Sequence, residues 1–186
     1  VSSVWIVSPN ILLPLGSEIE LRVEPGIQPE EGSEPGIERD HVYTIHTFPE
    51  FEFLGVNCRT LDGDSVVINP NAKVINDQRR CDPLGSLALR FSSPVITEVV
   101  KDKLLVIPDL AGGRTDYDPW ENMSSYTRLD ESHRPNQVYK VWLPGPLKAY
   151  ETYQLRSDTV TFQDEFGRPL SAPIDIQFAT DHRAPR

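Results

Sequence analysis

The sequence predicts an all-β protein built from antiparallel β-sandwiches. Seventeen prolines and eleven glycines interrupt its 186 residues so often that long helices are not expected. The apolar alternations between them are short, and turn residues recur about every 8 to 12 positions, which is typical of sandwich strands. A barrel is the alternative with the same local pattern.

The clearest element is a hairpin between Tyr150 and Thr180. Apolar and β-branched residues predict its first strand, and the alternation of apolar with polar residues predicts its second. These positions are Tyr153, Leu155, Val160 and Phe162, and then Ile174, Ile176 and Phe178. Between them, Gly167 suits a left-handed residue and Pro169 suits a position without a ladder donor. We therefore expect the segment 164–170 to be a turn and not a catalytic loop.

Shorter alternations predict further strands. They lie around residues 4–7, 18–23, 42–46, 51–56, 86–91, 103–108 and 138–143. The segment 109–134 is the least regular, and we expect it to be a crossover between strands of a sandwich. Asp118-Pro119 could begin a short helical turn there, because Asp caps helices and Pro suits the first helical position.

One internal repeat connects the start of the chain with the hairpin near its end. Leu21-Arg22 recurs as Leu155-Arg156, and Thr47 recurs as Thr180. Nothing in the first copy corresponds to residues 87–139, which precede the matching part of the second copy. We therefore expect an incomplete first domain and a chain that is a piece of a longer protein.

The repeat also divides the chain. The match extends upstream, where Val4-Trp5-Ile6 corresponds to Val141-Trp142-Leu143. We place the boundary near Thr47 to Glu50, so that residues 1–48 are the C-terminal part of a first repeat and residues 49–186 form a second domain.

Two cysteines, Cys58 and Cys81, frame a polar, loop-like insertion (58–81) in the second domain. An even count without CxxC or CxxH spacing favours a disulfide over a zinc site. Two unpaired buried thiols in a cytosolic domain are the alternative. A disulfide would indicate an oxidising compartment, which in a bacterium is the periplasm or the cell surface.

Charge and hydropathy limit the partners. A formal charge of −10 with 18 basic residues disfavours nucleic acid, whose phosphates require a basic face. No apolar run approaches the roughly 20 residues of a membrane-spanning helix. We expect neither nucleic acid nor direct membrane contact in this segment.

No catalytic motif is present, and we expect no catalytic, cofactor-binding or metal site. GxSxG, HExxH, phosphate-binding glycine loops and EF-hand spacing are all absent. The histidines are scattered and are expected at the surface; they are His41, His46, His133 and His182.

Two groups of residues, the carboxylates of the loop 109–121 and the three tryptophans, could have a binding function instead of a purely structural one. Carboxylates on an irregular loop could hold calcium, although a solvated acidic loop is the favoured interpretation; they are Asp109, Asp116, Asp118 and Glu121. Trp5, Trp120 and Trp142 could form a sugar platform if they were exposed and coplanar. Because two of them lie in apolar strand segments, core packing is the better explanation.

Four stretches resemble a bacterial Ig-like repeat. They are LALRFSSPV, LLVIPD, YKVWLPGPLKAYETYQLR and FQDEFGRPLSAPIDIQFAT. They match its F-S-x-P-V strand, its P-x-x-L-x-x-x-x-x-Y-x-L segment and its D-x-x-G-x-x-L turn before a closing F-x-T. Because the cysteines are paired between PEFEFLGVNC and CDPLGSLALRFSSPV, the chain looks most like the N-terminal region of bacterial α2-macroglobulin-like proteins.

This resemblance implies two Ig-like or macroglobulin-like sandwiches in a periplasmic protease trap with a lipid-anchored parent. Its partners would be neighbouring domains and, through the parent, trapped proteases. The family's thioester needs Cys-x-x-Gln, which neither Cys58 nor Cys81 begins, so no catalytic residue carries over. The competing hypotheses are a repeat of a surface adhesin or S-layer protein, and an accessory carbohydrate-binding module of an enzyme.

Overall fold

The computed structural model describes residues 6–26, 40–74, 79–121, 123, 128–130 and 138–182. The chain divides into two compact units, Val1–Pro49 and Glu50–Arg186. This division lies close to the boundary set from the sequence. Each unit is described by itself.

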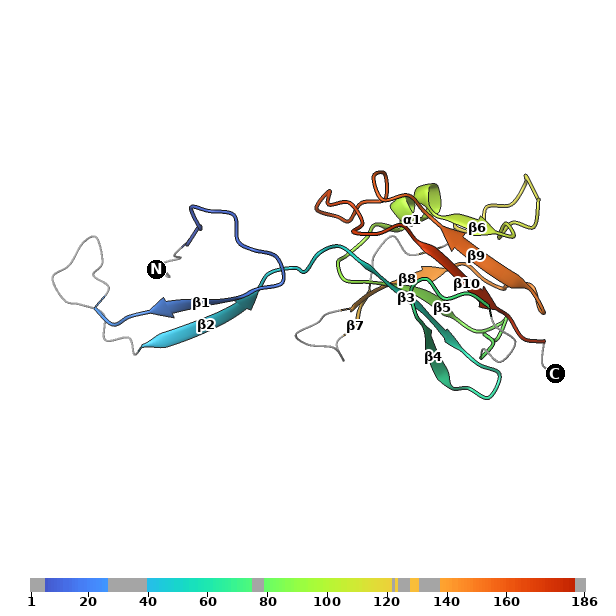
Figure 1. Cartoon of the computed structure of the whole chain (residues 1–186), viewed down its shortest axis with the longest axis horizontal. Coiled ribbons are helices and arrows are strands. Elements are labelled where there is room, and N and C mark those ends of the chain that lie inside the picture. Colours follow the sequence, from blue (N-terminus) through green and yellow to red (C-terminus); the bar gives the residue numbers. More distant parts are fainter. Residues whose placement is uncertain are drawn as a thin grey trace. The chain divides into compact units, whose positions relative to one another are not determined.

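In its described residues, unit 1 contains an antiparallel hairpin (Figure 1). Strand β1 (Glu18–Val23) pairs with β2 (His41–His46), and Leu21 lies opposite Tyr43. Alternation along the strands places five apolar side chains on one face, together with His41. These are Ile19, Leu21, Val23, Tyr43 and Ile45. The upstream match at Val4 and Trp5 lies outside the described residues, and Ile6 is in no strand.

The described part of unit 2 contains two antiparallel sheets (Figure 1). The larger has the order β4-β3-β5-β8-β7. Its strands are β3 (Phe53–Arg59), β4 (Ser65–Ile68), β5 (Leu87–Phe91), β7 (Arg128–Asp130) and β8 (Val138–Leu143). The smaller has the order β10-β9-β6, with β6 (Leu105–Ile107), β9 (Thr152–Arg156) and β10 (Asp175–Ala179). The all-β, sandwich-like fold is confirmed.

The core of unit 2 lies between these sheets. Apolar residues of both sheets form one buried cluster, in which Phe91 of β5 stacks on Phe162 at 5.7 Å between ring centroids. Tyr153 of β9 stacks in the same way on Phe178 of β10 at 5.4 Å. Each such side chain stabilises the fold by about 1.5 to 3 kcal/mol through burial.

The insertion between the cysteines was predicted to be a loop, but it contains a strand. Residues Ser65–Ile68 form β4, and Val66 lies opposite Cys58. The strand lies at the edge of the sheet, and Val67 is 45% exposed. Because the strand buries only one face and its neighbours in the sequence are polar, its apolar pattern is too weak to predict it.

A helix that was not predicted from the sequence precedes β6. The sequence predicted a strand from Lys103, but α1 (Thr97–Lys103) extends to that residue and β6 begins at Leu105. Thr97 and Val100 are buried on the same side of the helix, one turn apart. At Asp118 the predicted helical turn is a simple turn, in which the Asp118 carboxylate accepts the Trp120 N–H at 2.9 Å. Helix α1, which belongs to the described part of the chain, is not long enough to cross a membrane.

The predicted hairpin is confirmed for its two strands but not for Val160. The chain leaves β9 after Arg156, and Val160 is 72% exposed. Asp158 accepts hydrogen bonds from both the N–H and the hydroxyl of Thr161, which makes a local turn in place of a ladder. Phe162 is buried, as expected.

Candidate functional site

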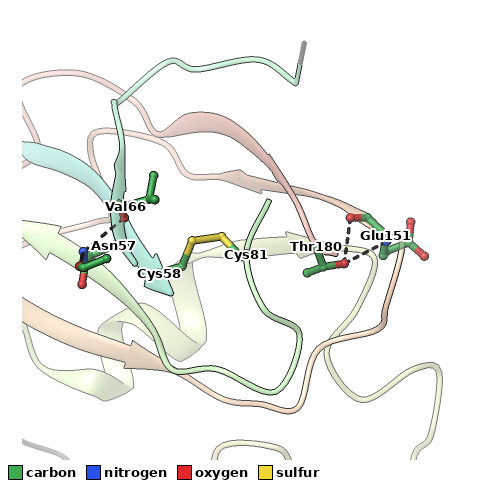
Figure 2. Close-up of a disulfide and its surroundings, with 7 residues drawn as sticks. Asn57, Cys58, Val66, Cys81, Glu151 and Thr180 are labelled. Carbon is green, nitrogen blue, oxygen red and sulfur yellow. Dashed lines mark hydrogen bonds between the residues drawn. A yellow bond between two sulfur atoms is a disulfide. The ribbon is translucent and has the colours of Figure 1, made fainter. Parts of the chain in front are cut away.

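The predicted disulfide between Cys58 and Cys81 is present (Figure 2), with Cα atoms 5.7 Å apart. Cys58 lies on β3, and Cys81 pairs in parallel with Thr180, directly after β10. The Cys81 N–H donates to the Ala179 carbonyl at 2.9 Å, and the Asp82 N–H donates to the Arg59 carbonyl at 2.7 Å. This segment therefore connects the end of β3, in one sheet, with the end of β10, in the other.

The same insertion covers the outer edge of β10. The Gln177 N–H donates to the Ala72 carbonyl at 2.7 Å, and Lys73 forms an ion pair with Asp175 at 2.7 Å. The hydrogen bond from Lys73, together with a second from Gln154, holds the pKa of Asp175 below its usual range. An uncovered edge strand is open to pairing with other chains, and the insertion closes this one.

A threonine fixes the corner beyond β10 (Figure 2). The buried Thr180 hydroxyl donates to the Lys148 carbonyl at 2.6 Å and accepts the Glu151 N–H at 3.0 Å. The Thr180 N–H donates to the Glu151 carbonyl at 2.8 Å, and the Tyr150 N–H donates to the Asp181 carbonyl at 3.1 Å. The corner leaves none of these groups without a partner.

The same network occurs beyond β2 in unit 1. The Thr47 hydroxyl donates to the Pro14 carbonyl at 2.7 Å and accepts the Ser17 N–H at 2.8 Å. The Thr47 N–H donates to the Ser17 carbonyl at 2.9 Å, and the Gly16 N–H donates to the Phe48 carbonyl at 2.9 Å. Each atom has its counterpart in the Thr180 corner, so the sequence repeat is also a repeat of structure.

The backbone at the two corners also agrees. Gly16 has φ of +59°, and Tyr150 at the equivalent place has φ of +54°. A tyrosine rarely adopts this left-handed conformation. The rest of the corner network therefore holds Tyr150 in a geometry that glycine adopts freely in unit 1.

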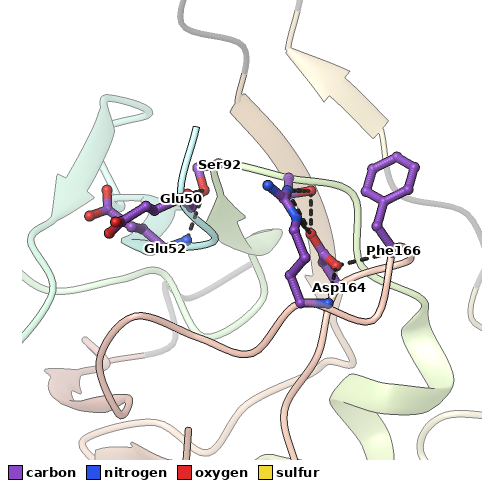
Figure 3. Close-up of polar contacts among 7 residues, drawn as sticks. Glu50, Glu52, Ser92, Asp164 and Phe166 are labelled. Carbon is purple, nitrogen blue, oxygen red and sulfur yellow. Dashed lines mark hydrogen bonds and ion pairs between the residues drawn. The ribbon is translucent and has the colours of Figure 1, made fainter. Parts of the chain in front are cut away.

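The turn predicted at 164–170 contains a buried carboxylate. The Asp164 side chain accepts hydrogen bonds from the Ser93 hydroxyl at 2.8 Å and from the Phe166 N–H at 3.0 Å (Figure 3). It also forms an ion pair with Arg168 at 2.7 Å. Gly167 has φ of +75°, as the turn requires. These contacts connect the turn to Ser93, the residue that follows Ser92 after β5.

Ser92, next to Ser93, holds the segment that precedes β3. Its hydroxyl donates to the Glu50 carbonyl at 2.6 Å and accepts the Glu52 N–H at 2.8 Å (Figure 3). The two serines of the F-S-x-P-V segment therefore have separate structural roles. Sequence reasoning assigned neither role, although the paired serines and the D-x-x-G turn were visible.

The acidic loop does not gather its carboxylates. Asp118 pairs with Lys101 at 2.5 Å, and Asp116 pairs with Arg114 at 3.2 Å. The hydrogen bond from Lys101 lowers the pKa of Asp118. Asp109 accepts the Gly113 N–H at 3.1 Å. Within the described residues, no three His, Cys, Asp or Glu side chains lie together as metal ligands.

The other candidate residues are dispersed. His41 and His46 lie at the two ends of β2, and His182 contacts Asp181 at 2.8 Å. Trp120 packs partly buried against the core, and Trp142 is half-buried on β8. His133 and Trp5 lie outside the described residues.

A polar hollow of about 290 Å³ lies between the turn after β3, the residues before Cys81 and Asp181. Its charged side chains are Asp62, Asp64, Arg79, Arg80 and Asp181. Arg79 faces Asp64 at 3.6 Å, and Arg80 donates to the Thr180 carbonyl at 3.1 Å. The arginines are thus engaged by groups of the protein itself.

Comparisons with models of protein families, with curated proteins and with solved structures gave no match, so no family is assigned to the chain.

Proposed function

We propose that this chain is a non-catalytic structural module of a bacterial periplasmic α2-macroglobulin-like protease inhibitor. The observation that carries the proposal is the duplicated threonine corner, at Thr47 and at Thr180. Two successive units of one chain end in the same hydrogen-bond network, as expected of a protein assembled from tandem modules. In this role the chain positions neighbouring domains and performs no chemistry.

The use of buried polar groups supports a structural role. Ser93, Asp164 and Thr180 are all at least 95% buried, and each has partners within the fold. Catalytic groups, in contrast, usually lie in a cleft where a substrate can reach them. These three stabilise turns and corners.

The disulfide supports an extracytoplasmic location. Disulfides persist in oxidising compartments and are rare in the reducing cytosol. Neither Cys58 nor Cys81 is a free thiol, so the reactive thioester of a protease trap would lie in another part of the parent. The module would then help to hold the bait and thioester regions in place.

A repeat of a surface adhesin or S-layer protein is the second candidate, because tandem repetition suits it equally well. The carbohydrate-binding alternative has less support. Trp120 packs against the core and Trp142 is half-buried, so these two do not form an exposed platform.

The test is made on the full-length protein that contains these residues. Antibodies raised against residues 50–182 are used to isolate it from the envelope fraction of its bacterium, and its mass is measured before and after treatment with methylamine. A thioester adds one methylamine and releases one thiol. We expect that addition, and cleavage by a protease should expose the thioester further.

Two results would overturn the proposal. A parent made of tandem copies that does not react with methylamine favours the adhesin. A parent found in the cytosol with Cys58 and Cys81 reduced removes the argument for an envelope protein.

A further inference from the structure

The β1–β2 hairpin exposes one apolar face. Leu21 is 36% exposed, and Tyr43 and Ile45 are each 51% exposed. The opposite face carries Glu18, Glu20, Arg22, Thr44 and His46, with Val42 as its one apolar side chain. The hairpin is therefore built to be covered on one side, and a two-stranded hairpin alone is only marginally stable in water.

The equivalent face in unit 2 is completely buried. Strands β9 and β10 have the same register as β1 and β2, since Leu155 lies opposite Ile176 where Leu21 lies opposite Tyr43. The matched positions are Ile19 and Tyr153, Leu21 and Leu155, Tyr43 and Ile176, and Ile45 and Phe178. The four unit 2 side chains are at most 1% exposed.

The larger sheet of unit 2 covers that face. Val56, Leu89 and Val141 of β3, β5 and β8 belong to the same buried cluster as the four β9–β10 side chains. At the edge of the hairpin, β6 pairs with β9, placing Val106 opposite Leu155. Both the face and the edge of the second hairpin are therefore occupied.

We propose that the apolar face of β1–β2 is a packing surface for a five-stranded antiparallel sheet of the β4-β3-β5-β8-β7 type. The sheet comes from polypeptide outside residues 1–186, and a strand equivalent to β6 pairs with the free edge of β1. The inference concerns the repeat itself, and it does not depend on which parent protein is proposed above.

Side-chain volume at the four matched positions supports this occupant. There β1–β2 carries two Ile, one Leu and one Tyr, and β9–β10 carries one each of Ile, Leu, Tyr and Phe, while Val23 and His41 complete the face of β1–β2 at its end. The two sets differ only by the exchange of Phe for Ile, and cores tolerate rearrangement when total volume is nearly kept. A sheet of the same kind can therefore close over either hairpin.

A second copy of this chain fits less well. Hairpin packing against hairpin would bury only the five partly exposed apolar side chains of this face from each copy. A stable interface buries about 800 Å² on each partner. The hairpin face alone is too small for that.

To test the proposal, a five-stranded sheet is added to the same polypeptide, ahead of the β1–β2 hairpin. A copy of residues 50–143, which carries β3, β4, β5, α1, β6, β7 and β8, is joined ahead of Val7, so that a complete five-stranded sheet precedes the hairpin. Hydrogen exchange of the β1–β2 amides is compared in the original and the extended chain. We expect exchange in the extended chain to be slower by at least about 100-fold, at all protein concentrations.

Matched variants identify the face. In the extended chain, Tyr43→Asp should abolish the protection, because it places a charge on the apolar face. Thr44→Asp, on the opposite face, should preserve it. Equal exchange in both chains, equal effects of the two variants, or protection of the original chain that rises with concentration would each overturn the proposal.

A second measurement covers the case in which the added sheet does not fold. The substitutions Tyr153→Ile, Ile176→Tyr and Phe178→Ile in the original chain place the apolar set of β1–β2 against the existing sheet. We expect unit 2 to retain its near-UV circular dichroism and a cooperative unfolding transition. Loss of both would overturn the fit between this apolar set and a sheet of this type.

Discussion

At the scale of single residues, the hydroxyl of Thr180 determines the corner beyond β10. It is buried and joins Lys148 and Glu151, which lie about 30 positions earlier in the chain. A buried donor or acceptor that loses its partner costs about 1 to 3 kcal/mol. The corner therefore depends on one atom, which a substitution can remove without changing the size of the side chain.

We expect Thr180→Val to lower the free energy of unfolding by about 2 to 3 kcal/mol, because the Lys148 carbonyl and the Glu151 N–H both lose their partner. Urea denaturation followed by tryptophan fluorescence measures the change. Thr180→Ser keeps the hydroxyl and is the control, with an expected loss of about 1 kcal/mol or less. If valine and serine destabilise equally, the hydrogen bonds are not what holds the corner.

Single residues were partly predictable. Thr47 and Thr180 stood out because the repeat aligned them, and Gly167 stood out because its turn needs a left-handed residue. The roles of Ser92 and Asp164 were not predictable, since their partners lie about 40 and 70 positions away in the chain. No local pattern encodes such contacts.

At the scale of elements, Gly55 allows β3 and β4 to pair. The register of β3 against β5 shifts between Phe53 and Gly55, and Gly55 has φ of +102°. A β-carbon at this position would lie 2.1 Å from the Ile68 carbonyl oxygen. The glycine thus provides both the bulge and the close approach of the edge strand.

We expect Gly55→Ala to lower the free energy of unfolding by about 3 kcal/mol or more, through the clash and the unfavourable φ together. Thermal unfolding and hydrogen exchange at Val66 and Ile68 measure the effect. Gly63→Ala is the control, because Gly63 also has a positive φ but would have open space around a β-carbon. Its cost should be about 1 to 2 kcal/mol. Equal costs would show that the clash with β4 is relieved elsewhere.

The ion pair at the edge of β10 should make stability depend on pH. Lys73 holds the pKa of Asp175 below its value in the unfolded chain. The ion pair therefore contributes fully to the free energy of unfolding above about pH 4. It is lost as the pH falls through the lowered pKa. We expect Asp175→Asn to lower the melting temperature at pH 7 and to match the wild type in strong acid. Asp62→Asn, in an exposed turn, is the control; a difference that persists in acid would contradict the assignment.

Strands with strong alternation were predicted well, and elements with weak patterns were not. The periodicity of 138–143 and 174–179 was clear because each strand buries one face against the other sheet. Edge strand β4 and the seven-residue helix α1 bury little, so their sequences resemble loops. Val160 was wrongly assigned to a strand because β-branched residues are common in strands. It lies instead in the turn that Asp158 forms with Thr161.

At the scale of the whole molecule, the two units carry the same terminal hairpin in different surroundings. In unit 2 the larger sheet packs on the face of the hairpin, β6 pairs with one edge, and the cysteine-framed insertion covers the other. In unit 1 the hairpin has kept the register and the corner, while its apolar face is exposed. Local hydrogen bonding thus specifies the hairpin, and its stability depends on what covers it.

The disulfide should stabilise unit 2 without being required for its fold. The loop that it closes spans 23 positions, for which the chain-entropy model gives about 3 kcal/mol. Because the core lies between the sheets, we expect the double variant Cys58→Ala and Cys81→Ala to fold with a lower melting temperature. In this variant, amide exchange at Gln177 and at position 81 should accelerate most, since both amides donate hydrogen bonds between the insertion and β10. The central β5–β8 pair is the internal control.

Alkylation provides the decisive comparison for the wild type. Both thiols should resist alkylation in the folded protein until a reductant is added, and intact mass then increases by two adducts. Reduction should lower the melting temperature by the same amount as the double variant, because both remove the same constraint from the unfolded chain. Free alkylation without reductant would contradict the bridge. If reduction lowers the melting temperature much more than the double variant does, the loss of the cross-link does not account for the whole effect. The two unpaired thiols would then disturb the packing around Cys58 and Cys81.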